Sequence, residues 1–170
     1  SGSVTFSSMA KRLGPFLRAL WRAAPPMREP PLNATDQAKR RSSFDHGVIR
    51  MPTSFPGFHG AHAEDLYRAC IAHIGAHICY SGPRFPVRKL KPIQIAVISL
   101  LEDARVESLA MREFPGLKRL WLPLHVAQTP SSLSPNNALM APNMLARLAR
   151  ALIDPEFEDF DGWVMKARTE

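Results

Sequence analysis

The chain has 170 residues, of which 45% are hydrophobic, and it carries a formal net charge of +7. This length suits one domain with a hydrophobic core, and no apolar run reaches the roughly 20 residues that a membrane-spanning helix needs. The sequence therefore predicts a mainly α-helical single domain without a membrane span, whose 16 prolines mark long connecting loops.

The N-terminal part predicts an amphipathic helix followed by a linker. Residues 1–3 (Ser-Gly-Ser) are typical of a cloning remnant, whereas residues 4–23 place apolar and basic side chains at helical spacing. Gly14 and Pro15 are expected to kink or break this helix. Residues 24–43 are rich in proline, asparagine, serine and basic side chains, which is typical of a flexible linker.

The main helical domain is expected over residues 44–170. Residues 45–47 (Asp-His-Gly) predict a turn, and residues 48–52 predict a short edge strand that ends at a proline. Two long central helices are expected at 61–81 and 93–112, where apolar residues recur at helical spacing. The first half of the second helix is apolar nearly all round, which indicates a position in the middle of the domain.

Shorter elements are expected in the C-terminal part. A short helix or turn is predicted at 117–122 and a helix at 142–153, with a polar loop at 128–137 between them. The two cysteines, Cys70 and Cys79, fall within one predicted helix about 13 Å apart along its axis, which is too far for a disulfide. This use of cysteine suits a reducing compartment, so we expect a cytoplasmic protein.

Three histidines of the first long helix fall on one stripe: His62, His73 and His77. His73 and His77 have the i, i+4 spacing by which one helix offers two imidazoles to a single metal ion. The position after His73 is Ile74, so the glutamate of the zinc-protease motif is missing. The other histidines, His46, His59 and His125, lie near glycines, prolines or turns and are expected to be structural or exposed.

The second long helix carries a group of charged residues after its apolar stretch: Glu102, Asp103, Arg105 and Glu107. A buried carboxylate needs a cation, an imidazole or a metal as partner. One interpretation is an internal network, in which Arg105 pairs with Glu102 or Glu107 and histidines donate to the remaining carboxylate.

The other interpretation is a metal site formed between the two long helices, if these pack antiparallel as in helical-bundle metal proteins. Its ligands would be His73, His77, Glu102 and Glu107, with Asp103 and His62 as further candidates, and iron or zinc as the metal.

Several activities have no motif in the sequence. A phosphate-binding P-loop and a Gly-x-Ser-x-Gly elbow are both missing, so ATP hydrolysis and serine-hydrolase chemistry are not supported. Basic runs at 39–41 and 84–91 have few aromatic residues among them. They favour a solvated basic face over a nucleic-acid site.

One longer motif resembles a known family. Residues 101–117 read LEDARVESLAMREFPGL, and residues 90–94 read LKPIQ. Together they resemble the signature of the nitric oxide reductase activation protein family, NorD, and are similar to the Rubisco-activation subunit CbbO. A Glu-x-x-Arg-x-Glu pattern more distantly resembles the cobaltochelatase subunit CobT. Segments at 119–121, 162–164 and 166–168 extend the resemblance over roughly residues 45–170.

The resemblance implies a helical N-terminal domain that in the family precedes a von Willebrand factor A domain. Such proteins act as adaptors for a MoxR-type AAA+ ATPase that remodels a client enzyme, in several cases to allow insertion of a metal centre. This chain has no Asp-x-Ser-x-Ser motif of an A domain, so we expect a fragment or a stand-alone relative. Glu102, Arg105 and Glu107 match the polar residues of the motif.

Two functional hypotheses follow. The first is a non-enzymatic adaptor domain for an AAA+ ATPase and a client metalloenzyme, which docks through its N-terminal helix or residues 116–125. Its expected contact residues are Trp21, Arg119 and Trp121. The second is a metal-binding domain that delivers a metal ion or uses it hydrolytically through the His and carboxylate site.

Overall fold

Residues 3–83, 86, 89–125, 140–159 and 162–169 are described by the structure, a computed structural model. The chain divides into two compact units, Ser1–Ser81 and Gly82–Glu170, and each is described by itself. The prediction of a mainly helical fold with two long helices is confirmed. The polar loop predicted at 128–137 lies outside the described residues. Among the described helices, none combines the length and the apolar character that crossing a bilayer requires.

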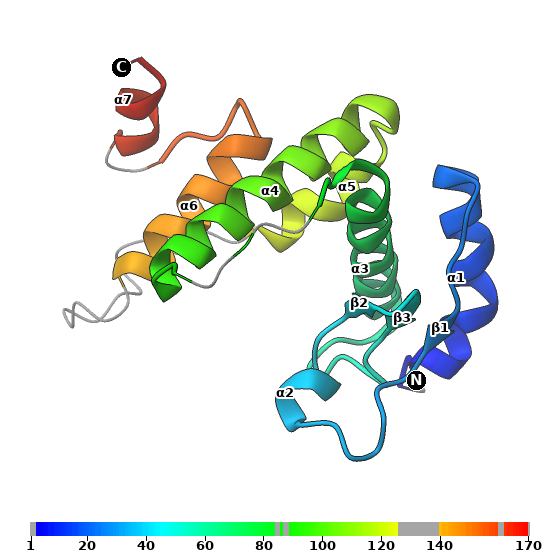
Figure 1. The fold of residues 1–170 in the computed structure, drawn as a ribbon. Coiled ribbons are helices and arrows are strands. Elements are labelled where there is room, and N and C mark those ends of the chain that lie inside the picture. Colours follow the sequence, from blue (N-terminus) through cyan, green and yellow to red (C-terminus); the bar gives the residue numbers. More distant parts are fainter. Residues whose placement is uncertain (1–2, 84–85, 87–88, 126–139, 160–161, 170) are drawn as a thin grey trace. The chain divides into compact units, whose positions relative to one another are not determined.

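The first unit consists of three helices and three short strands (Figure 1). They are α1 (Phe6–Trp21), β1 (Met27–Arg28), α2 (Asp36–Lys39), β2 (Ser43–Asp45), β3 (Val48–Arg50) and α3 (Gly60–Tyr80).

The boundary between the units differs from the one expected at residue 44. Helix α1 packs along α3 within the first unit (Figure 1), and residues 24–43, expected to form a linker, contain β1 and α2. The proline-rich backbone is held by hydrogen bonds, since Ile49 N donates to Pro26 O at 2.9 Å and Met51 N donates to Arg28 O at 2.9 Å. Composition alone did not reveal this backbone pairing.

Helix α1 begins with a capping box. Ser8 N donates to Thr5 Oγ1 at 3.4 Å, and Thr5 N donates to Ser8 Oγ at 3.1 Å, so two backbone donors at the helix start are satisfied. The helix continues through Pro15, which lies on its exposed side. The predicted break at this position is therefore not observed.

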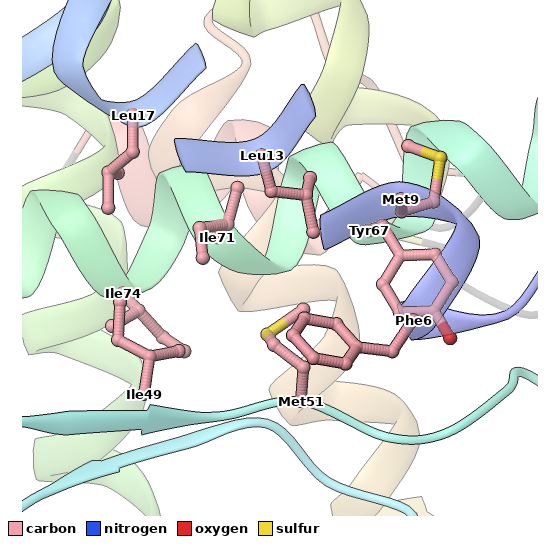
Figure 2. Packing of buried hydrophobic residues seen from close by; sticks show 9 residues of the cluster. All are labelled: Phe6, Met9, Leu13, Leu17, Ile49, Met51, Tyr67, Ile71 and Ile74. Carbon is pink, nitrogen blue, oxygen red and sulfur yellow. The ribbon is translucent and has the colours of Figure 1, made fainter. Parts of the chain in front are cut away.

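The core of the first unit lies between α1, α3 and the strand segment (Figure 2). Apolar side chains recur on α1 at three- and four-residue spacing and meet those of α3, as expected for two amphipathic helices. The buried cluster consists of Phe6, Met9, Leu13, Leu17, Ile49, Met51, Tyr67, Ile71 and Ile74.

The small sheet of this unit has the order β1-β3-β2. Strand β3 pairs parallel with β1 and antiparallel with β2, so it is the central strand, and the prediction of an edge strand here was wrong. The predicted turn before it is confirmed. His46 and Gly47 have φ of 47° and 74°, and two positive φ angles are what a two-residue type I′ hairpin requires.

The second unit is helical throughout its described elements. They are α4 (Pro92–Glu113), α5 (Leu117–Trp121), the 3₁₀ helix η1 (Leu122–Leu124), α6 (Met140–Ile153) and α7 (Trp163–Thr169). Figure 1 shows α6 lying along α4, and these two helices make the most extensive contact in the unit.

Helix α4 is buried only in its second half. Ala104, Val106 and Ala110 lie in the interior together with Glu107, whereas Ile93 near the start is 50% exposed. The expectation that the apolar first half lies in the middle of the domain was therefore wrong. Within this unit α4 contacts α6 and α5, and its apolar residues Ile93 and Leu101 remain exposed.

The C-terminal tail is tied to α6 by charged side chains. Arg168 Nη2 donates to Ala151 O at 3.0 Å and to Asp154 O at 2.9 Å, where α6 ends. Arg147 on α6 pairs with Asp159, whose carboxylate caps α7 by accepting from Val164 N at 3.0 Å. These contacts give the segment at 162–168, which extends the resemblance, an architectural role.

The close packing of α1 on α3 depends on Gly75. A Cβ atom at this position would lie 2.6 Å from Trp21 Cε3 and 2.7 Å from Leu17 Cδ1. We predict that Gly75→Ala lowers the free energy of unfolding by about 1–3 kcal/mol, because the two helices must move apart. The measurement is urea unfolding followed by far-UV circular dichroism.

Gly14 on α1 provides the matched control, since a Cβ there would make only ordinary contacts, the nearest at 3.6 Å. Gly14→Ala should leave stability unchanged or raise it by up to about 1 kcal/mol through helix propensity. Equal effects of the two substitutions would contradict this packing.

The side chain of Tyr67 on α3 is fully buried in the first unit. Its hydroxyl donates to Pro52 O and Thr53 O, both at 2.9 Å, and burial raises the pKa of Tyr67 from 10.0 to about 12. The unfolded chain releases this proton at lower pH than the folded chain does. The stabilisation is therefore fully present below pH 10 and is lost as the pH rises through about 12.

We predict that the free energy of unfolding falls by about 2–3 kcal/mol over this window because of Tyr67 alone. Urea unfolding at several alkaline pH values checks this, with Tyr67→Phe as the comparison. The variant should be less stable near neutral pH but should have a shallower pH slope. A slope identical to that of the unmodified chain would refute the assignment.

Candidate functional site

The two histidines predicted to share a metal lie together on α3 in the first unit. The ring centroids of His73 and His77 are 4.7 Å apart with the rings inclined at 72°, and both side chains are half-buried. His77 Nδ1 is 2.9 Å from Ser81 Oγ. His62 is exposed and lies roughly 16 Å before His73 along the helix axis, so it does not share a ligand set with them.

Glu102 and Arg105 form a surface pair on α4. Arg105 Nε donates to Glu102 Oε2 at 2.7 Å, and Nη2 donates to Oε1 at 2.8 Å, which is a bidentate arrangement. The hydrogen bond to Glu102 raises the pKa of Arg105 above its ordinary value. The predicted pairing of Arg105 with Glu102 is thus confirmed.

Glu107 lies on another side of α4 and is only 4% exposed. Its Oε2 lies 3.0 Å from Nε2 of His125, the residue that directly follows η1. A carboxylate only accepts hydrogen bonds, so Nε2 carries the proton and donates it to Glu107. The network interpretation correctly required an imidazole for a carboxylate of this helix, but the histidine that supplies it is His125, which had been expected to be structural or exposed.

The two predicted carboxylate ligands, Glu102 and Glu107, lie on different sides of α4. Glu102 and Glu107 are about 140° apart around α4 at roughly 100° per residue, so they do not share a face. Each carboxylate has its own partner within the second unit. The convergence of these residues with His73 and His77 stays a prediction.

A pocket of about 220 Å³ lies in the second unit beside the Glu107–His125 pair. Asp103 reaches it from α4, one turn before Glu107, and His125 forms part of its wall. The complete lining is Ala96, Ser99, Leu100, Asp103, Ala104, His125 and Ala149. This pocket joins a carboxylate, a hydroxyl and an imidazole in one space.

The residues predicted to contact a partner protein differ in accessibility. Trp121 is only 2% exposed, so its docking role stays a prediction without an accessible side chain here. Trp21 is half-buried against the core of the first unit, whereas Arg119 is exposed. Trp121 is the last residue of α5 and is buried there, because its large apolar surface gains much from burial.

No protein-family model, curated protein or solved structure matches the chain. The resemblance to NorD and CbbO therefore rests on the motif at 101–117 and stays a prediction.

The Glu107–His125 pair should matter more for stability than the pair on the surface. The substitution His125→Ala removes the imidazole that donates to the buried Glu107 carboxylate. We expect the free energy of unfolding of the second unit to fall by about 2–4 kcal/mol. Arg105→Ala, the matched control, removes the exposed partner of Glu102 and should change stability much less, because solvent screens an exposed ion pair.

Native-state hydrogen exchange of the amides of residues 104–110 measures both effects within the second unit. Faster exchange in His125→Ala than in Arg105→Ala is the expected result. The reverse order would mean that Glu107 does not depend on His125.

Proposed function

We propose that this chain is an accessory domain that binds a MoxR-type AAA+ ATPase and helps it act on a client metalloenzyme. The resemblance of residues 101–117 to NorD and CbbO motivates the proposal. Its structural support comes from the way α4 presents this motif.

Helix α4 divides the motif between interior and surface. Glu107 points into the unit, where His125 holds it, and Ala104 and Val106 fill the interior beside it. Glu102 and Arg105 pair on the exposed side. In this proposal Glu107 has an architectural role, and the exposed side of the motif is the part that a partner protein meets.

The observation that carries the proposal is an apolar stripe on that exposed side. Ile93, Val97 and Leu101 follow one another at four-residue spacing and lead to Arg105. Ile93 is 50% and Leu101 is 47% exposed, and Val97 is half-buried. Contiguous exposed apolar side chains bordered by charged residues are typical of protein-binding surfaces.

This stripe replaces Trp121 as the expected centre of docking. Apolar anchors surrounded by polar residues commonly provide most of the free energy at protein interfaces. The charged Glu102–Arg105 pair lies at the end of the stripe and would provide orientation more than affinity.

Binding to the purified MoxR-type ATPase of the same organism tests the proposal. We expect a stable complex by size-exclusion chromatography with light scattering. Ile93→Gln/Leu101→Gln should weaken it at least about tenfold, because two apolar anchors are lost. Isothermal titration calorimetry provides the affinities.

Leu32→Gln is the matched control, since Leu32 is 96% exposed in the first unit and lies far from the motif in sequence. It should bind like the unmodified chain. Absence of a complex, or equal binding by the stripe variant and the control, would contradict the proposal.

A further inference from the structure

Two serines follow the basic run at 39–41, and the structure places them in different surroundings. Residues 39–44 read KRRSSF. Ser42 is half-buried, and its side chain forms a hydrogen bond with the thiol of Cys70 on α3. Ser43 is the first residue of β2 and is exposed. Of the two serines, Ser43 is therefore the one whose hydroxyl is accessible to another molecule.

The outer face of the small sheet places two arginines beside Ser43. Ser43 is directly opposite Arg50 on β3, and Arg50 is in turn paired with Arg28 on β1. Opposite side chains of neighbouring strands lie on one face, with their Cβ atoms about 5 Å apart. Ile49, the neighbour of Arg50, is fully buried in the core, so the row of Ser43, Arg50 and Arg28 lies on the outer face.

The two guanidinium groups of this row donate to backbone carbonyls. Arg28 Nη1 donates to Met27 O at 3.0 Å, and Arg50 Nη1 donates to Glu29 O at 3.2 Å. Each guanidinium has five N–H donors, so these two bonds use a small part of their capacity. Like charges on opposite residues of a sheet repel each other, and an anion beside them removes that repulsion.

We propose that Ser43 is a phosphorylation site and that Arg50 and Arg28 bind the phosphate on it. The arginines at 40 and 41 match the charge pattern by which basophilic serine kinases select a substrate, with arginine two and three residues before the acceptor. Strand β2 lies at the edge of the sheet, so one side of this extended segment is open to a kinase.

The reaction is the transfer of a phosphoryl group from ATP. A bond forms between Ser43 Oγ and the γ-phosphorus, and the bond from that phosphorus to the departing ADP breaks. The proton of the hydroxyl passes to the catalytic base of the kinase. The product carries about −1.5 to −2 charges at neutral pH and three acceptor oxygens, which suit two guanidinium groups.

The phosphate would connect the three strands of the sheet through side chains, because Ser43, Arg50 and Arg28 each come from a different strand. All of these residues belong to the first unit. The inference is therefore independent of the apolar stripe on α4 and of ATPase docking.

Treatment of the full chain with ATP, Mg²⁺ and the catalytic subunit of cyclic-AMP-dependent protein kinase, a basophilic serine kinase, tests the acceptor. We expect a phosphate that peptide mass spectrometry locates at Ser43. Ser43→Ala should abolish this modification, and Ser42→Ala, the matched control, should retain it. Phosphate at Ser42, or no phosphate at either serine, would overturn the proposal.

A ³¹P NMR titration of the phosphorylated chain tests the two arginines. The second pKa of phosphoserine is ordinarily about 6, and neighbouring guanidinium groups should lower it because they stabilise the dianion. Arg50→Gln and Arg28→Gln should each return this pKa toward its ordinary value. Lys11→Gln removes an exposed charge of the same sign from α1 and should leave it unchanged.

The acid on this face, Asp45, has the opposite effect on the phosphate and is the same in all variants. It lies two residues after Ser43, and its Oδ2 is 3.3 Å from His46 Nε2. Far-UV circular dichroism verifies folding, and Arg28 is exposed, so Arg28→Gln gives a second variant with little risk to the core. A phosphoserine pKa that neither arginine substitution changes would overturn the proposal.

Discussion

The second unit is organised around one buried carboxylate. Glu107 lies on the side of α4 that also carries Ala104 and Ala110 into the interior, so packing that side places a carboxylate where water is excluded. An ionised carboxylate is costly to bury unless a donor replaces the water. His125 supplies that donor, and the hydrogen bond joins the segment after η1 to the middle of α4. The chain therefore has to turn back through α5 and η1 to place the imidazole.

The first unit depends on a steric constraint of another kind. Gly75 has no side chain, and the ring of Trp21 occupies the space that a methyl group would need. This lets α1 approach α3 closely, and the apolar stripe of α1 completes the core shown in Figure 2. Tyr67 then connects α3 to the backbone of residues 52–53 with two hydrogen bonds. The apolar side chains of α1 and the missing side chain of Gly75 together explain why the N-terminal helix belongs to this unit.

Local patterns predicted the local structure well. The long helices follow from apolar periodicity bounded by proline and glycine, and the Arg105–Glu102 pair follows from i, i+3 spacing on a helix. The turn at residues 45–47 was predicted because glycine readily adopts positive φ.

Contacts between distant residues could not be predicted in the same way. His125 lies 18 residues from Glu107, after the short element predicted at 117–122, so only the need of a buried acid for a donor pointed to such a partner. The pairing of β1 with β3 places a proline-rich segment in a sheet through backbone hydrogen bonds that its composition does not indicate. Burial of Trp121 likewise depends on how α5 packs, and a tryptophan in sequence suits a core and an interface equally well.

The exposed side and the interior side of α4 have different roles in the function that we propose for this domain. In this proposal the stripe that ends at Arg105 meets a partner protein, while Glu107 holds the interior of the unit through His125. One helix thus supports both roles because residues about half a turn apart face different surroundings.

The state of the His125 ring tests the central claim most directly. Long-range ¹⁵N–¹H correlation NMR, with His125 assigned by comparison with His125→Gln, reports which ring nitrogen carries the proton. The account predicts a fixed tautomer near neutral pH, protonated on Nε2 toward Glu107 and unprotonated on Nδ1. A proton on Nδ1, or averaging between the tautomers as in a solvent-exposed histidine, would contradict it.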